Sequence, residues 1–277
     1  GGRVFVSLTL FDLSGAFGLF VAGFELLVAY ALVRFLLTSD EEIGSATSRS
    51  LIEQHAQLAG AVLVCEPSAD GGALKIGRKG IAGYRVEIRG RAAHAGLEPE
   101  LGVNAGVELA HQILSIASLS SGETTVTPTI LAGGTTVNTV PERAHVRVEA
   151  RSWTTAELEK VDRLMSELTP NLPGAQVIVT GGIRRRPFEQ ETALTALAEA
   201  EQAASMLGIS LPAPVRSGGV SDGNLTAGLG IATLDGLGAI GGHPHGRGEN
   251  VVITTMPERV ALLAALIARL AERPGAL

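Results

Sequence analysis

The sequence predicts an α/β fold in which a mostly parallel sheet carries an inserted α+β domain. Two short apolar runs, 33–38 (VRFLLT) and 61–65 (AVLVC), flank a segment with helical periodicity, 45–59. Buried parallel strands are continuous apolar runs, and a helix between two such runs is typical of a parallel sheet. Further along, 84–89 (YRVEIR) and 144–150 (AHVRVEA) alternate apolar and polar residues, as half-exposed strands do.

The alternating strands belong to a segment of their own. Helical periodicity at 104–119 and 154–168 and further strand patterns at 125–131 and 176–180 predict two helices that cover one face of a sheet. We place this inserted domain at 76–184. The first domain then comprises 1–75 and 185–277, where helical patterns (191–207, 257–272) and glycine-rich loops follow.

Composition excludes several classes of protein. Of the 277 residues, 45% are hydrophobic and 18% charged, which is ordinary for a folded domain. The net charge is −6 and the longest basic run is Arg184–Arg186, so we expect no nucleic-acid partner, which would require a concentrated basic face. Cys65 is the single cysteine, which excludes an internal disulfide and a cysteine-built zinc site and fits a reducing, cytoplasmic location.

The stretch 13–37 is almost entirely apolar. A membrane helix needs about 20 such residues, so a membrane span is one interpretation. Glu25 and Arg34 lie inside the stretch, and charges are costly in hydrocarbon. We therefore expect a buried helix followed by a buried strand.

Carboxylates follow both apolar runs. Asp40, Glu41 and Glu42 come after the first run and Glu66 after the second. Ligands of parallel sheets bind at the C-terminal ends of the strands, which is where these acids fall. A solvated loop is the alternative for the acidic cluster, and a cap or turn residue is the alternative for Glu66. A divalent cation would remove the repulsion between adjacent carboxylates.

A glycine-rich loop, 241–250, contains His243 and His245. These histidines are either surface residues or metal ligands, because neutral imidazole is a common zinc ligand. Without cysteine, a site must use His, Asp and Glu, a set that suits zinc, cobalt or manganese. Together the loop and the acids indicate a His/carboxylate metal centre.

Several segments carry a resemblance to a known family: LLTSDEEIGS, CEPS, GRKGIAGYRVEIRGRAAHAG, AGGTTVNTVPERAHVRVEARSW, RSGGVSDGN and TLDGLGAIGGHPHGRGENV. In this order they resemble successive signatures of the dinuclear zinc exopeptidase and deacylase family, which includes carboxypeptidase G-type glutamate carboxypeptidases, acetylornithine deacetylase and succinyl-diaminopimelate desuccinylase. The resemblance implies a phosphorylase/hydrolase-like catalytic domain with an inserted ferredoxin-like dimerisation domain. It also implies a homodimer that cleaves an amide beside a free carboxylate in an N-acyl amino acid or peptide, with one or two zinc ions (cobalt or manganese as alternatives).

The resemblance assigns roles within the metal centre. Glu41 matches the general base, which takes a proton from the metal-bound water. Glu42 matches a ligand of one metal and Glu66 a ligand of the other. His245 matches the C-terminal histidine ligand because it precedes Glu249 by four positions, whereas the neighbouring histidine has the wrong spacing.

In the inserted domain, His94 resembles the histidine that reaches the partner subunit's site and stabilises the oxyanion; a satisfied turn histidine is the alternative. Asn138 and Arg151 resemble residues that bind the substrate's carboxylate, a task that suits the planar guanidinium. The resemblance also implies a substrate-binding segment at Ser221, Asp222, Gly223 and Asn224, where glycines would let backbone amides approach the substrate closely.

The N-terminal segment departs from the family pattern. No histidine precedes His55, so the family's His-x-Asp motif is absent. Asp12, in FDLSG, resembles the bridging aspartate, with a helix cap as the alternative. The remaining ligand set would then be complete at one metal and incomplete at the other, so we expect reduced activity from a truncated or altered sequence. The competing interpretation is a non-catalytic dimerising relative, or a fragment without a competent metal site.

Overall fold

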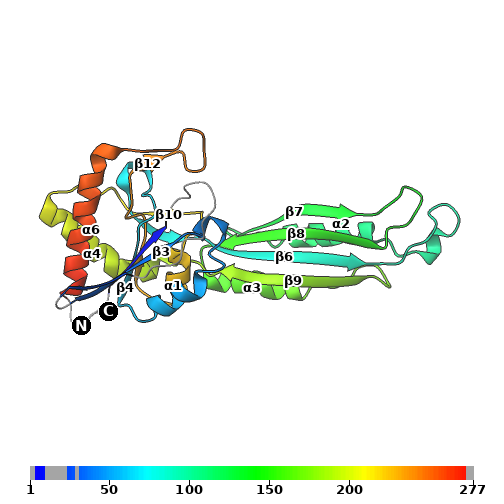
Figure 1. Ribbon diagram of the computed structural model, residues 1–277. Helices are drawn as coiled ribbons and strands as arrows, with labels where there is room; N and C mark the ends of the chain where they lie inside the picture. Colours follow the sequence, from blue (N-terminus) through cyan, green and yellow to red (C-terminus); the bar gives the residue numbers. More distant parts are fainter. Residues whose placement is uncertain (1–3, 10–23, 29–30, 273–277) are drawn as a thin grey trace. The chain divides into compact units, whose positions relative to one another are not determined.

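The computed structural model describes residues 4–9, 24–28 and 31–272 (Figure 1). The chain divides into two compact units, one formed by Gly1–Lys79 with Pro187–Leu277 and the other by Gly80–Arg186. Each unit has its own sheet and its own buried apolar clusters.

A five-stranded sheet organises the first unit. Its order is β11-β4-β1-β3-β2, from β1 (Val4–Thr9), β2 (Phe24–Val28), β3 (Ala31–Thr38), β4 (Ala61–Val64) and β11 (Thr233–Leu234). All neighbours pair in parallel except β2, which is antiparallel to β3. The C-terminal ends of β3, β4 and β11 therefore lie at one edge of the sheet.

Strand β4 shows why helices cover both faces of this sheet. Its four residues are all buried, and they alternate between two clusters. Ala61 and Leu63 belong to the cluster that includes α4 (Leu194–Leu207) and α6 (Met256–Ala271), which pack side by side. Val62 and Val64 pack with α1 (Arg49–Ala56) and α5 (Gly223–Ala227). A strand buried on both faces requires such a continuous apolar run.

Short elements connect the sheet to its loops. Strand β5 (Lys75–Arg78) pairs in parallel with β10 (Val215–Ser217), and β12 (Gly241–Gly242) pairs antiparallel with β13 (Asn250–Val251). Single helical turns occupy Glu41–Ile43 (η1), Asp70–Gly72 (η2), Gln190–Ala193 (η4) and Ile253–Thr255 (η5).

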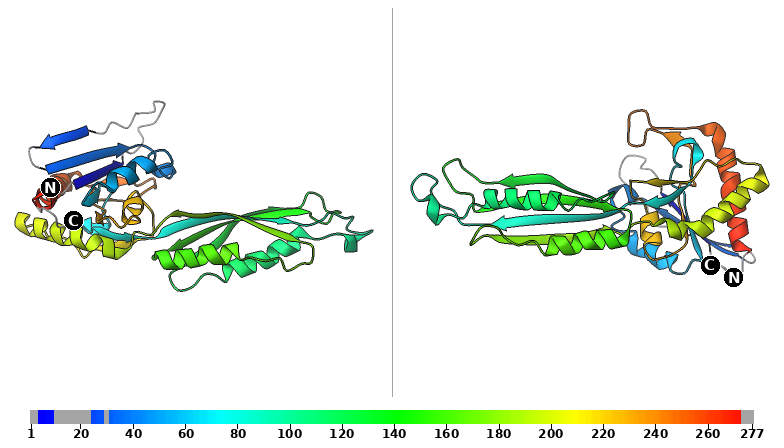
Figure 2. Two further views of the ribbon diagram at one scale, coloured as in Figure 1. Left: turned by 90° about the horizontal axis from the view of Figure 1, so that it is seen from below. Right: turned by 180° about the vertical axis from the view of Figure 1, so that it is seen from behind.

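The second unit is an antiparallel four-stranded sheet with two helices on one face (Figure 2). Its order is β7-β8-β6-β9, from β6 (Gly80–Arg89), β7 (Thr125–Gly133), β8 (Arg143–Ser152) and β9 (Gln176–Arg185). Helices α2 (Ala105–Ala117) and α3 (Thr155–Ser166) begin after Asn104 and Thr154, whose side chains cap them. A short turn, η3 (Pro99–Leu101), precedes α2. The opposite face of this fully described unit carries no helix.

The predicted α/β class and the α+β insert are confirmed, and the N-terminal prediction requires a correction. Phe24–Val28 is a strand rather than part of a helix, because it pairs antiparallel with Ala31–Phe35. Residues 10–23, where the rest of that helix was expected, lie outside the described residues. Helix α1 begins at Arg49 and not at Ser45, whose φ of 55° is incompatible with a helix. Strand β1 was not predicted.

No helix in the described ranges is long and apolar enough to cross a membrane.

Glu108 is a fully buried carboxylate in α2 of the second unit. It accepts hydrogen bonds from the backbone amides of Asn171 (3.0 Å) and Leu172 (2.7 Å) and from Gln112 Nε2 (2.7 Å). Burial alone would raise the pKa of Glu108, but these donors outweigh it and lower the pKa below the usual 4.5. The carboxylate thus attaches the segment before β9 to α2.

We expect Glu108→Gln to destabilise the protein by about 1–3 kcal/mol, because an amide group would face donors that need an acceptor. Since the folded pKa is lowered, this stabilisation is present above pH 4.5 and is lost as the pH falls through the folded value. Urea unfolding of both proteins at neutral and acid pH measures the effect. The exposed Glu100→Gln is the control, and equal unfolding midpoints for both variants would contradict the account.

Candidate functional site

The acids of interest follow strands that end at the same edge of the first sheet. Glu41 and Glu42 form the turn η1 after β3, Glu66 follows β4, and Asp235 follows β11. Strands β3 and β4 each pair with β1, so they lie about 10 Å apart. The parallel topology therefore brings carboxylates from separate parts of the sequence to one edge.

His245 lies beside Glu42. Its Nε2 is 3.9 Å from Glu42 Oε2, and the two side chains are 76% and 46% exposed. The histidine comes from the loop between β12 and β13, and its φ of 61° is a left-handed conformation that non-glycine residues rarely adopt. An imidazole and a carboxylate from distant segments thus meet at the solvent-accessible edge of the unit.

Asp40 organises the turn that presents the two glutamates. Its Oδ2 accepts hydrogen bonds from Thr47 Oγ1 (2.6 Å), Thr47 N (2.8 Å) and Ser48 N (3.1 Å). Burial opposes ionisation of this carboxyl, but the hydrogen bonds from Ser48 and Thr47 prevail and lower its pKa to about 2. Asp40 is therefore a structural residue that stabilises the loop after β3.

A buried ion pair joins Arg78, at the end of β5, to Asp235, which follows β11. Arg78 Nε and Asp235 Oδ2 are 2.7 Å apart, with side-chain exposures of 5% and 0%. Asp235 Oδ2 also accepts from Ser221 Oγ at 2.7 Å, and Asp235 Oδ1 accepts from the amide of Gly236. Arg78 Nη1 donates to the carbonyl of Gly219 at 3.1 Å. These bonds connect β5, β11 and the loop after β10.

Glu41 and Glu66 act electrostatically on the same guanidinium. Burial would lower the pKa of Arg78, but Asp235 prevails and raises it, with smaller contributions from Glu66 and Glu41. Burial, together with Asp235 and Glu66, raises the pKa of Cys65 to about 12. The thiol is therefore protonated at neutral pH and does not supply a thiolate ligand.

The predicted substrate-binding segment, 221–224, is buried. Asp222 accepts from Ser45 Oγ (2.5 Å) and Thr38 Oγ1 (3.4 Å). Asn224 accepts from the amide of Ser221 (3.0 Å) and donates to the carbonyl of Lys79 (3.1 Å). The polar side chains of this segment thus bind other parts of the protein, and they connect it to the loop that carries the glutamates.

The side chains present at this edge can be compared with the ligands that a metal ion requires. Glu42 and His245 are a carboxylate and an imidazole, donors that suit zinc, and their nearest atoms are 3.9 Å apart, somewhat wider than the about 3.4 Å between two donors of one tetrahedral zinc. Among the described residues no group of three or more His, Cys, Asp or Glu side chains could hold a metal. Asp12, predicted as the bridging ligand, lies outside them. The described part of the chain therefore supplies an incomplete ligand set.

In the second unit, His94 and Asn138 lie on paired segments at one end of the sheet. His94 forms a bridge with Thr139, and Ala95 N donates to Asn138 O at 2.9 Å. His94 Nδ1 accepts from the amides of Gly96 and Leu97, both at 3.1 Å. In the neutral ring the proton is then on Nε2, which is left as a donor on an exposed side chain.

Arg151 lies at the other end of that sheet, where its Nε donates to Glu149 Oε1 at 2.7 Å. The eight residue-to-residue steps from Arg143 to Arg151 span about 27 Å at 3.4 Å per step. The segment with His94 follows β6 beyond the Arg89–Arg143 pair. Arg151 and His94 of one copy therefore cannot contact the same small molecule.

Arg78 and Asp235 were not predicted as site residues. Both lie in segments that carry the family resemblance, GRKG and TLDGLG. Nothing in these patterns distinguishes a buried ion pair from surface charges, because its partners are brought together only by the fold.

Comparisons with known proteins support the resemblance. Residues 76–173 match the family described as the peptidase dimerisation domain of M20. The chain is 33% identical to carboxypeptidase G2 of Pseudomonas sp. (strain RS-16) over 251 residues, covering 86% of this chain and 59% of that protein. The chain covers between 58% and 66% of the length of the curated relatives that it matches.

Solved structures share the fold. Aminopeptidase PepT from Bacillus cereus superposes with a TM-score of 0.74 at 20% identity, covering 98% of this chain and 81% of the other. The YXEP protein of Bacillus subtilis, described as a dinuclear metal-binding peptidase of the M20 family, gives a TM-score of 0.65 at 19% identity, with coverages of 87% and 66%. The predicted family resemblance is thereby confirmed.

We expect Asp235→Ala to destabilise the protein by about 3–5 kcal/mol, because it leaves the buried Arg78 without its counter-charge. The midpoint of denaturant-induced unfolding measures the loss. Glu53→Ala removes an exposed pair with Arg49 and is the matched control, with an expected cost below about 0.5 kcal/mol. Similar losses in the two variants would show that the buried pair does not hold the strand ends together.

Proposed function

Residues 76–173 are a peptidase dimerisation domain of the M20 type, and from this premise we propose that the chain acts as a metal-dependent amidohydrolase. The bond cleaved is an amide beside a free carboxylate, in an N-acyl amino acid or a peptide. The resemblance to carboxypeptidase G2 favours release of glutamate or a similar amino acid. The observation that carries the proposal is the proximity of Glu42 and His245, whose Oε2 and Nε2 atoms are 3.9 Å apart.

Glu42 and His245 would hold the metal, with Asp12 as a further ligand. Zinc suits this donor set, with cobalt or manganese as alternatives. A second ion would use Glu66, which follows β4 at the same edge of the sheet. When bound, such an ion polarises the scissile carbonyl and lowers the pKa of its water toward about 7.

Glu41 is the proposed general base. It is adjacent to the proposed metal ligand Glu42, it is half-buried, and it lies in the turn η1 that Asp40 stabilises. Its carboxylate takes a proton from the attacking water and passes it to the leaving amine. Arg78 and Glu41 interact electrostatically, so a positive charge acts near the proposed base.

Substrate binding is proposed to need two copies of the chain. His94 Nε2 of one copy donates to the oxyanion at the metal centre of the other, which agrees with its Nδ1 being occupied by backbone amides. Asn138 and Arg151 bind the substrate's carboxylate. Because His94 and Arg151 lie at opposite ends of one sheet, a single site can contain both only if they come from different copies. The segment 221–224 contributes backbone amides, with Gly223 permitting a close approach.

A non-catalytic dimerising relative is the second candidate. It is favoured by the incomplete ligand set among the described residues. Metal analysis combined with an assay on N-acyl glutamates distinguishes the two. Bound metal with turnover supports the hydrolase, whereas neither at any zinc or cobalt concentration supports the non-catalytic protein.

We expect Glu41→Gln to reduce hydrolysis by at least about 100-fold while metal content is retained, since only the proton carrier is removed. His245→Ala should lose metal and activity together. Metal content by mass spectrometry and initial rates check both variants. If Glu41→Gln also lost its metal, the roles assigned to Glu41 and Glu42 would be exchanged.

Edge strand β7 is the proposed contact between copies. Its Ile130 and Leu131 are 60% and 58% exposed, and an edge strand with apolar side chains is a template for pairing. We expect Ile130→Asp to convert dimers to monomers in light scattering after size-exclusion chromatography. Gln176→Asp, exposed on the opposite edge strand β9, is the control and should remain dimeric. A dimer that survives the first change and dissociates with the second would place the contact at β9.

A further inference from the structure

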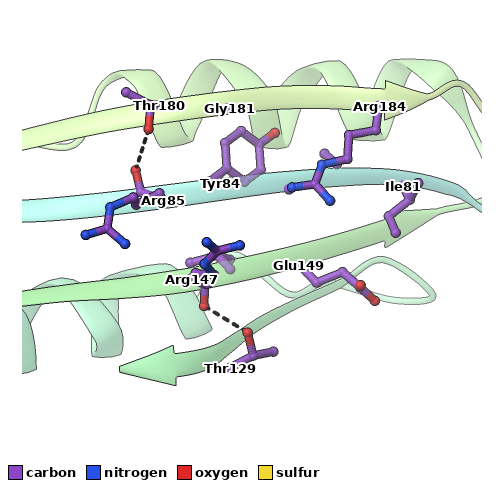
Figure 3. Close-up of a pocket in the computed structure, with 12 residues that line it drawn as sticks. Ile81, Tyr84, Arg85, Thr129, Arg147, Glu149, Thr180, Gly181 and Arg184 are labelled. Carbon is purple, nitrogen blue, oxygen red and sulfur yellow. Dashed lines mark hydrogen bonds between the residues drawn. The ribbon is translucent and has the colours of Figure 1, made fainter. Parts of the chain in front are cut away.

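The helix-free face of the second unit contains a hollow of about 330 Å³ (Figure 3). We define the open-face hollow by six of its lining residues: Gly83, Arg85, Arg147, Glu149, Thr180 and Arg184. They come from three neighbouring strands, β6, β8 and β9. The volume lies near the lower end of small-molecule sites, which are about 300–1,000 Å³.

Positive charge is concentrated in this hollow although the chain is acidic overall. Arg85 and Arg147 are directly opposite each other in the pairing of β6 with β8. Like charges at such positions destabilise a sheet. The third guanidinium, that of Arg184, extends along the same face. The sheet therefore bears an electrostatic cost here that a bound anion would offset.

The nearby carboxylates have other hydrogen-bonded partners. Glu149 accepts from Arg151 at 2.7 Å, and Glu87 accepts from Arg89 at 2.9 Å. Within the fully described unit 80–186, Arg85 and Arg147 form no ion pair of this kind. The hollow thus has a net excess of positive charge.

Glycine provides the floor of the hollow. A Cβ added at Gly83 would lie 2.6 Å from Arg184 Cζ and 2.7 Å from its Nη2, so the guanidinium lies directly over the bare backbone. Gly182 stands opposite Gly83 in β9, which leaves the floor without side chains on both strands. An alanine at position 83 would displace Arg184 from the hollow.

We propose that the open-face hollow binds a small molecule that carries a phosphate group. Guanidinium groups form paired hydrogen bonds with phosphate and with carboxylate. A carboxylate offers two oxygens in one plane, whereas a terminal phosphate offers three oxygens and a charge near −2. Two guanidinium groups that lie opposite each other, those of Arg85 and Arg147, match the phosphate better. The proposal is independent of the metal centre and of hydrolysis.

The test is isothermal titration calorimetry of the full chain with pyrophosphate and with inorganic phosphate, in the presence of a chelator so that no metal binds either probe. We expect saturable binding to wild type and at least about tenfold weaker binding to Arg147→Ala and to Gly83→Ala. Arg89→Ala, whose guanidinium is on the same strand but pairs with Glu87, is the matched control and should bind as wild type. Arg85→Ala provides a second variant if one of the others fails to fold by circular dichroism.

Four results would overturn the proposal. The first is no binding of either probe to wild type. The second is unchanged binding to Arg147→Ala and Arg85→Ala. The third is equal binding of a dicarboxylate such as glutarate, which would remove the reason for assigning a phosphate. Preference for an acidic peptide over both phosphates would likewise contradict a small-molecule site.

Discussion

Arg78 and Asp235 form an ion pair that is almost completely excluded from water, and Asp235 follows a strand that ends at the same sheet edge as the strands before the candidate metal ligands. Asp235 binds Ser221 as well as Arg78, so one carboxylate connects β5, β11 and the loop after β10. Removing either partner would leave a buried charge unpaired, which is costly, so the two residues stabilise the protein only when both are present. Since Glu41 and Glu66 act on the same guanidinium, the pair also sets the electrostatic environment of the strand ends.

Parallel topology supplies the second requirement. Strands β3, β4 and β11 run in one direction, so every residue that follows them emerges at one edge. The loop between β12 and β13 reaches this edge, and it places the imidazole of His245 near the carboxylate of Glu42. In the other unit an antiparallel sheet separates His94 from Arg151 by most of its length. A site that uses both residues is thereby a property of two copies rather than of one.

Much of this fold follows from periodicity. The buried strands at 33–38 and 61–65, the alternating strands of the insert and its two helices were predicted near their observed bounds, because their patterns agree with local propensity. Phe24–Val28 was expected to be helical, since an apolar segment without alternation does not distinguish a strand from a buried helix. The position of the acids at the strand ends could be predicted from the sequence, and their role as site residues stays a prediction. Arg78 and Asp235 could not, because burial and pairing across the sequence leave no local pattern.

The central claim is that Glu42 and His245 bind a common cation. X-ray absorption spectroscopy of the zinc-loaded chain tests it most directly, because it reports the atoms bound to the metal. The account predicts nitrogen and oxygen neighbours at about 2.0–2.2 Å with an imidazole contribution that disappears in His245→Ala. A sulfur neighbour at about 2.3 Å, or an imidazole signal that persists in the variant, would contradict it.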